Sequence, residues 1–321
     1  MDTWLDWFST AQAALYENIL QPVAFAMGLG NRLEDIFDAS GWFLVALLQL
    51  AVMLLVISPL QRWRPIEPVT DRRAIRLDVL YTLIRRFGLM RIFLFFAIEP
   101  TLDDWFGYWR VQGFSNFNLD DVWPGVTDQA WVSFALYLVL FDFLNYVIHR
   151  LQHHWNWWWA LHAVHHSQRQ MTQWTDSRNH LLDDFITSVI WIFVAQVVGI
   201  EPGQFVAVVA ITQLSENLQH ANARLNFGDW GERLWVSPRF HRVHHAVGLG
   251  HESPSRVLGG HNFGVLLPWW DMLLGTADFQ TQDVQTGIRD QVEQGRDYGE
   301  GFWAQQVLGI KRLIQALRSS V

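Results

Sequence analysis

A run of 19 uncharged residues, from Trp42 to Leu60, constrains the fold of this chain more than any other feature. As a helix it is about 28 Å long, which matches a hydrocarbon layer of about 30 Å. The run is therefore predicted to cross a membrane. The loop that follows is rich in arginine, and such loops normally stay on the cytoplasmic side, so we expect the N-terminus on the opposite side. The arginines are Arg62, Arg64, Arg72, Arg73 and Arg76.

Further apolar segments predict an all-α integral membrane bundle with about four or five spanning or re-entrant helices. Residues 79–99 are apolar but contain Arg85, Arg86 and Arg91, so they form either a span with snorkelling arginines or an interfacial helix. The remaining apolar segments are 131–148, 185–200 and 204–214, and the last is short for a full span.

Composition excludes some classes of function. The chain has 23 basic and 31 acidic residues, so it lacks the concentrated basic surface that phosphate binding needs, and no nucleic-acid partner is expected. Because it contains no cysteine, any metal must be held by nitrogen and oxygen ligands. Its 19 Trp and 22 Phe are typical of a protein at a membrane interface. The Trp-rich stretch 155–159 either walls an entrance for a lipid chain or, as we expect, acts as an interface anchor.

The histidines are clustered and regularly spaced. All 13 lie between positions 149 and 261, and three segments read HRLQHH (149–154), HAVHH (162–166) and HRVHH (241–245). Residues three and four apart lie on one face of a helix, so each segment can direct its imidazoles towards a metal ion. A lone histidine is more often a hydrogen-bonded ring, but the repetition favours metal binding. Counting crossings from the arginine-rich loop places the histidines at the cytoplasmic face.

The number of imidazoles predicts two metal ions, since eight rings exceed what one ion can use. Imidazole suits Zn, Cu, Fe and Ni, so the residues alone leave the metal open. The H-E-x-x-H motif of metalloproteases is absent, as are the Glu-x-x-His pairs of ferritin-like bundles, the G-x-S-x-G motif and the Walker A motif. The eight candidate ligands are His149, His153, His162, His165, His166, His241, His244 and His245.

Longer motifs surround these histidines. The sequence DFLNYVIHRLQHH begins at Asp142, LHAVHHS begins at Leu161, QHAN ends at Asn222, and NFGVLLPWWDMLLGT begins at Asn262. Together with HRVHH, these motifs resemble the fatty acid hydroxylase / sterol desaturase superfamily of membrane di-iron enzymes. The resemblance covers residues 142–276. It implies two iron ions, with zinc able to replace them in recombinant material, and dioxygen as co-substrate.

The resemblance also implies hydroxylation or desaturation of a C–H bond in a lipid, with electrons from a separate donor such as a cytochrome b5-like protein, a ferredoxin or a reductase. It carries over the eight histidines as ligands and adds His220 from the H-x-N element. His154 completes the first motif either as a ligand or as a neighbour of the ligands. His180 is a weaker match, because Leu181 stands where relatives have proline. The two remaining loop histidines, His251 and His261, match no motif and are not expected to be ligands.

A site built from neutral imidazoles needs carboxylates that orient the rings and balance the charge. Asp142 is the foremost candidate, because it lies within an apolar segment, seven residues and about two helical turns before His149. Asn222 of the H-x-N element is expected beside the ligands as well. Other candidates are Asp176, Asp183, Asp184, Glu216, Glu252 and Asp271.

Three regions are predicted: a membrane-anchoring region at 1–130 with spans near 42–60 and 79–99, a catalytic histidine domain at 131–278, and a C-terminal surface segment with an amphipathic helix at 279–321. The metal-binding cap is expected on the cytoplasmic face of the bundle. Two other functions stay open. A zinc-dependent membrane hydrolase or lyase would use the same histidines without an electron donor. A metal-binding or transport protein would be expected to place its ligands inside the spans.

Overall fold

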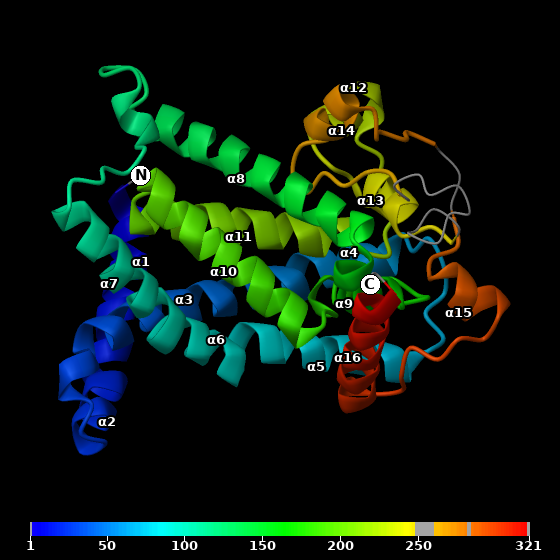
Figure 1. Ribbon diagram of the computed structural model, residues 1–321, viewed down its shortest axis with the longest axis horizontal. Coiled ribbons are helices and arrows are strands. Elements are labelled where there is room, and N and C mark those ends of the chain that lie inside the picture. The colour runs from blue at the N-terminus through cyan, green and yellow to red at the C-terminus, as the bar shows by residue number, and fades with distance from the viewer. Residues whose placement is uncertain (1, 248–259, 281–283, 320–321) are drawn as a thin grey trace.

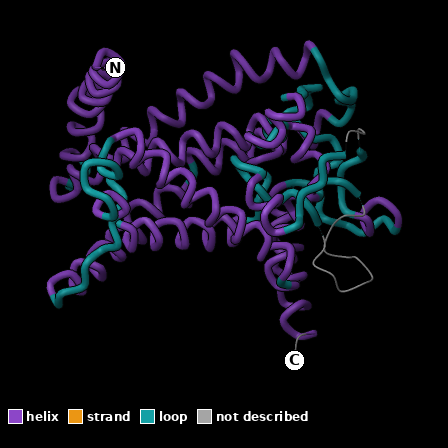
Figure 2. Tube along the Cα trace, turned by 90° about the horizontal axis from the view of Figure 1, so that it is seen from above, coloured by secondary structure: helices purple, strands orange, loops and turns teal. Residues whose placement is uncertain are grey.

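The computed structural model describes residues 2–247, 260–280 and 284–319. Within these residues all regular elements are helices, joined by loops, and the only strand-like pairing is an isolated bridge between Ala246 and Thr286 (Figure 2). The first half of the chain contains α1 (Asp2–Leu15), η1 (Tyr16–Leu20), α2 (Gln21–Ala26), η2 (Gly30–Arg32), α3 (Leu33–Val52), η3 (Met53–Ile57), α4 (Ser58–Trp63), α5 (Arg72–Phe87), α6 (Leu89–Phe93), η4 (Leu94–Ile98), α7 (Glu99–Val111), η5 (Leu119–Asp121) and α8 (Ala130–His154).

The second half has short helices and three helices of 18 residues. These elements are α9 (Asn156–His166), η6 (Thr175–Ser177), α10 (Leu181–Val198), α11 (Pro202–Gln219), α12 (Gly228–Leu234), α13 (Pro238–His244), α14 (Trp269–Leu274), α15 (Arg289–Glu293) and α16 (Phe302–Ser319).

Three helical segments of the described chain are long and apolar enough to cross a membrane: Gly30–Trp63, Ala130–His154 and Leu181–Val198. The first two contain the predicted apolar segments 42–60 and 131–148. The third contains the predicted segment 185–200 except for its last two residues. Figure 1 shows α3, α8 and α10 running along the long axis of the molecule, with α11 packed against α3 and α8. The outer face of the first segment exposes Leu48, Leu54 and Leu55, as expected for a surface in contact with lipid. The fold is therefore an all-α membrane bundle.

The apolar region at 79–99 does not form one continuous helix. Helix α5 ends at Phe87 and α6 begins at Leu89, with Gly88 in an extended conformation between them. A Cβ atom on residue 88 would collide with the carbonyl oxygen of Ile84, so glycine is required at this break. The region is accordingly not one of the three candidate spans.

Aromatic packing holds the long helices together. Tyr137 and Phe141 of α8 are fully buried, and the Phe141 ring stacks on Trp191 of α10 at a centroid distance of 4.8 Å. Val208 of α11 closes the same core cluster. Because lipid is as apolar as these side chains, close packing rather than removal from water holds the helices together, and α8, α10 and α11 support the segments at their ends.

The histidine-bearing segments meet at one end of the bundle. Helix α8 stops at His154, Trp155 adopts an extended conformation, and α9 starts directly after it in a new direction. Helix α13 and the closing segment 260–278 lie beside this turn (Figure 1). The C-terminal helix α16 packs along α9 with one face, and its outer face exposes apolar side chains such as Trp303 and Val307.

Candidate metal centre

Nine buried histidines form two adjoining clusters. Within each cluster, the possible ligand atoms of the histidines all lie within 4.8 Å of one another. The clusters include all eight histidines predicted from spacing, together with His220. The rings of His166 and His245, one from each cluster, stack at a centroid distance of 4.3 Å. The five-histidine cluster contains His149, His153, His162, His166 and His244, and the four-histidine cluster contains His165, His220, His241 and His245.

The H-x-x-H-H motifs divide their rings between the two clusters. In α9, the i, i+4 pair His162 and His166 faces the five-histidine cluster, and His165 faces the other. In the HRVHH segment the pattern is reversed. The i, i+4 pair His241 and His245 joins the four-histidine cluster, and the histidine at i+3 joins the five-histidine cluster. Successive residues of a helix point about 100° apart, so a His-His doublet can contribute to two neighbouring metal ions.

Ring spacing within the clusters fits metal coordination. The Nε2 atom of His220 lies 3.1 Å from Nε2 of His165 and 3.0 Å from Nε2 of His241, and His241 Nε2 lies 3.2 Å from that of His245. In the other cluster, the Nε2 atoms of His166 and His244 are 3.1 Å apart. When two nitrogen ligands each lie about 2.1 Å from a metal ion, the distance between them depends on the nitrogen–metal–nitrogen angle. It is about 3.0 Å at an angle of about 90° and about 3.4 Å at the tetrahedral angle. The observed distances fall in this range.

Four of the rings are held through Nδ1, which leaves Nε2 to face the cluster. Backbone carbonyl oxygens accept from His149, His220 and His244 at 2.9, 2.7 and 2.8 Å. A carbonyl only accepts, so each of these Nδ1 atoms carries the proton and each Nε2 presents a lone pair. The fourth ring, His162, bonds to a carboxylate at 3.1 Å. The acceptors are the carbonyls of Phe263, Glu216 and His261 and the carboxylate of Asp183.

Asp183 is the carboxylate that contacts a candidate ligand. It lies in the first turn of α10, and besides His162 it accepts hydrogen bonds from Gln152 Nε2 at 2.8 Å and Trp158 Nε1 at 2.7 Å. The anchor interpretation of the tryptophan stretch is therefore wrong for Trp158 and Trp159, which are only 2% and 7% exposed. The Trp159 ring contacts the ring of His153 at a centroid distance of 4.9 Å, and Trp158 reaches the cluster through its bond to Asp183.

Asp142 supports the centre indirectly. Its carboxylate accepts from the backbone amides of Leu266 and Leu267 at 2.7 and 3.2 Å and from Trp270 Nε1 at 2.9 Å. Asp271 accepts from the amide of Phe263 at 2.9 Å, and the carbonyl of that residue binds His149. The two carboxylates thus hold the closing segment in position against the histidines.

The other residues singled out from the sequence lie elsewhere. Asn222 accepts hydrogen bonds from the amides of Ile66 and Glu67, so it fixes the loop after the first span. His154 is exposed at the end of α8, outside both clusters. Both ring nitrogens of His180 are engaged, Nε2 with the Gln306 carbonyl and Nδ1 with an amide of its own helix. His261 offers its backbone carbonyl rather than its ring, and His251 and Glu252 lie outside the described residues.

Burial favours the form of the rings that binds metal. Burial, followed by the neighbouring imidazoles, lowers the pKa of His165, His166, His241, His244 and His245 well below the ordinary value of 6.5. These rings are therefore neutral at pH 7, and neutral imidazole is the coordinating species. A dense group of buried neutral nitrogens with converging lone pairs fits a pair of metal cations.

An all-helical membrane bundle with two adjoining histidine clusters, each able to hold a metal ion, is the class that the fold and the site define. Residues 134–276 match the family model described as fatty acid hydroxylase. Over this segment the chain is similar to the fatty acid hydroxylase and sterol desaturase superfamily. The matched segment contains every clustered histidine.

Three relatives illustrate the similarity. Ornithine lipid hydroxylase OlsE of Rhizobium tropici is 29% identical over 54% of this chain and 50% of its own length. Alkylglycerol monooxygenase of Homo sapiens is 27% identical over 66% of this chain and 44% of its own. Delta(7)-sterol 5(6)-desaturase ERG3B of Gibberella zeae is 28% identical over 39% of each chain. The chain thus spans half or less of these relatives' lengths, and no solved structure matches it.

Proposed function

We propose that this protein is a membrane-bound di-iron oxygenase that uses O2 and external electrons to hydroxylate or desaturate a C–H bond of a lipid. The observation that carries the proposal is the pair of buried histidine clusters, with five and four converging rings. The names of the relatives support a lipid substrate, because they act on an ornithine lipid, alkylglycerol and a sterol. A transport pathway is less well supported, because the rings gather at one end of the bundle rather than along the spans.

The residues of the chain would hold and orient the two ions. The five-histidine cluster and the four-histidine cluster would each bind one ion through Nε2 atoms, with carbonyl groups and Asp183 fixing the rings through Nδ1. Bound iron would activate O2, which is the oxidant that attack on a C–H bond requires. Burial would exclude bulk water and so protect the oxidising chemistry from side reactions.

The overall reaction needs partners. In hydroxylation, one oxygen atom of O2 enters the C–H bond and the other leaves as water, while the donor supplies two electrons and the solvent two protons. In desaturation the same electrons and protons are consumed, two hydrogens leave the lipid, and both oxygen atoms leave as water. We infer a separate electron donor of the cytochrome b5, ferredoxin or reductase type, which would approach the end of the bundle that carries the histidines.

The arginine-rich loop supports a cytoplasmic location for the metal centre, with the N-terminus on the opposite side of the bilayer. In this proposal residues 1–130 anchor the protein, 131–278 carry the chemistry, and 279–321 cover the histidine-bearing helices. The packing of α16 on α9 supports the role of the last region as a cover.

The first experiment is metal analysis of detergent-purified protein from cells grown with iron-57. We expect about two irons per chain and a Mössbauer spectrum of a spin-coupled pair. One metal or none would overturn the paired centre. Two zinc ions that support turnover of lipid under strict anaerobiosis would overturn the oxygenase and leave a hydrolase or lyase.

A further inference from the structure

Two adjoining cavities lie among the helices, and the second is lined by residues that are one helical turn from candidate ligands. The outer cavity has a volume of about 530 Å³ and the inner one about 170 Å³. Trp42, Arg85, Phe95 and Gln213 line both, so the two cavities adjoin, and together they are called the chamber. Pockets of this combined size are typical of sites for ligands of lipid or cofactor size.

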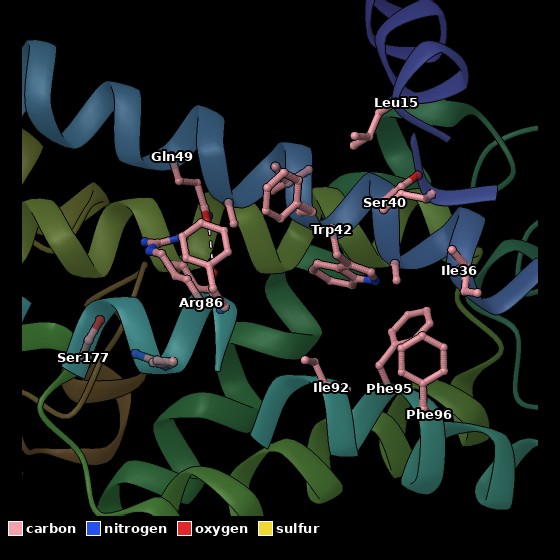
Figure 3. Close-up of a pocket in the computed structure, with 18 of the residues that line it drawn as sticks. Leu15, Ile36, Ser40, Trp42, Gln49, Arg86, Ile92, Phe95, Phe96 and Ser177 are labelled. Carbon is pink, nitrogen blue, oxygen red and sulfur yellow. Dashed lines mark hydrogen bonds between the residues drawn. The ribbon is translucent and has the colours of Figure 1, made fainter. Parts of the chain in front are cut away.

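The chamber changes from apolar to polar along its length. Figure 3 shows Ile36, Phe95 and Phe96 around one end of the outer cavity and Gln49 and Arg86 around the other. Ile36 and Gln49 both line the outer cavity and are 13 residues apart on helix α3, which corresponds to about 20 Å. This length is more than half the thickness of a hydrocarbon layer of about 30 Å. The outer end can therefore hold a chain, and the far end suits a polar group.

The inner cavity lies next to the candidate ligands. Its lining residue Asn145 is one helical turn before His149 on α8, and Glu216 is one turn before His220 on α11. Asp184, which also lines it, follows directly after the carboxylate that binds His162. A group bound in the inner cavity is thus about one helical turn, or about 5 Å, from a histidine of each cluster.

Asn145 presents an unused hydrogen-bond donor at this position. The residue is 9% exposed, and its Oδ1 accepts from Trp191 Nε1 at 2.9 Å. Because the indole nitrogen only donates, this bond fixes the orientation of the amide. The Nδ2 atom then has no acceptor among the described residues. A buried donor without a partner is costly, so a bound ligand that supplies an acceptor is favoured.

The charge of the inner cavity selects among polar groups. Its lining contains three carboxyl groups and one guanidinium, and Arg85 is already paired with Asp176 at 3.2 Å. An anionic group is therefore disfavoured, whereas a neutral group with acceptor oxygens can bind. The carboxyl groups belong to Glu99, Asp184 and Glu216.

We propose, building on the proposed function, that the chamber binds an uncharged lipid with its polar end inward. The polar group accepts a hydrogen bond from Asn145 Nδ2, and the chain runs outward past Trp42 towards Ile36 and Phe96. This orientation places the carbons next to the polar group, not the middle or the methyl end of the chain, beside the histidines. Oxidation consequently falls within a few bonds of the polar group.

Photolabelling tests this orientation without metal or turnover. Metal-free protein in phosphatidylcholine nanodiscs is labelled with two monoacylglycerols, one with a diazirine beside the ester carbonyl and one with a diazirine beside the terminal methyl. The first probe should label peptides around the inner cavity, with Ser188 and Thr212, and the second should label those with Ile36 and Phe96. The opposite pattern, or the same pattern for both probes, would overturn the proposal.

Variants sharpen the test. Ser188→Trp fills the inner cavity and should abolish labelling there, whereas the control Leu55→Trp, on the lipid-facing surface, should not. Asn145→Asp keeps an acceptor for Trp191 but removes the Nδ2 donor, and it should weaken binding of the ester probe about fivefold. An equivalent free fatty acid should compete less well than the monoacylglycerol. Equal competition by the two lipids, or an unchanged affinity of the Asn145→Asp variant for the ester probe, would refute the assigned polar site. The proposed oxygenase function would still be tested separately, by metal analysis.

Discussion

Replacing Asp183 by asparagine tests the support of the metal centre most directly. The carboxylate accepts hydrogen bonds from three donors: His162 Nδ1 at 3.1 Å, Gln152 Nε2 at 2.8 Å and Trp158 Nε1 at 2.7 Å. Asparagine has one acceptor oxygen and an amino group that only donates. At least one donor in the substituted protein therefore faces another donor, and His162 loses the negative charge that orients and strengthens it as a ligand.

The expected loss is confined to one ion. Removing the partner of a metal-binding histidine typically weakens metal affinity 10- to 100-fold, or about 1.4 to 2.7 kcal/mol. His162 belongs to the five-histidine cluster, and the four rings of the other cluster have no contact with Asp183 among the hydrogen bonds of the described chain. Asp183→Asn should thus weaken one of two binding steps and leave the second within about twofold of its value.

The assay is an anaerobic titration of metal-free protein with Fe(II) or Co(II) against a chromophoric chelator. Asp290→Asn is the matched control, because Asp290 is a buried carboxylate that bonds to Tyr298 and Arg296 instead of a histidine. The reasoning fails if both steps keep their affinity in a folded Asp183→Asn protein, or if both weaken equally.

Three further predictions follow from the geometry. His154→Ala should retain two metals per chain by elemental analysis, because this ring is outside both clusters, whereas His220→Ala should retain about one; equal metal content in the two variants would contradict the assignment. Asp142→Ala should lower thermal stability strongly, since it leaves Trp270 Nε1 and two backbone amides without an acceptor, at about 1–3 kcal/mol each, and a melting temperature close to that of the parent protein would refute this role. Metal-free protein should lose stability as the pH falls below about 6.5, because rings such as His165 stay neutral in the folded state, where their pKa is lowered, but bind protons in the unfolded state. The slope should reach about 1.4 kcal/mol per pH unit for each such ring, and a flat dependence in chemical denaturation between pH 8 and 5 would contradict the burial of the histidines.

The sequence alone determines the local features of this protein. The uncharged run from Trp42 to Leu60 can bury its backbone polar groups in a bilayer only as a helix, so its length is enough to predict a span. The intervals of three and four between histidines place rings on shared helix faces, because the geometry of a helix is the same in every protein. These two regularities lead to an all-α membrane protein with a histidine metal centre.

The tertiary structure decides which groups meet. Sequence spacing leads to Asp142 as the partner of the ligands, yet Asp183 holds that position, because α10 packs against α9 and directs its first turn at His162. The acceptor for His149 is the carbonyl of Phe263, 114 positions away. Every residue carries a backbone carbonyl, so no side-chain pattern marks the one that a ring will contact.

The division of the His-His doublets between two clusters has the same origin. Spacing shows that His165 and His166 point in different directions, but not which ion each of them faces. That depends on where α8, α11 and α13 end in space, and hence on how the aromatic core between the long helices sets their positions. Local geometry is written in intervals along the chain, whereas the assembly of a site depends on packing between segments that are far apart in it.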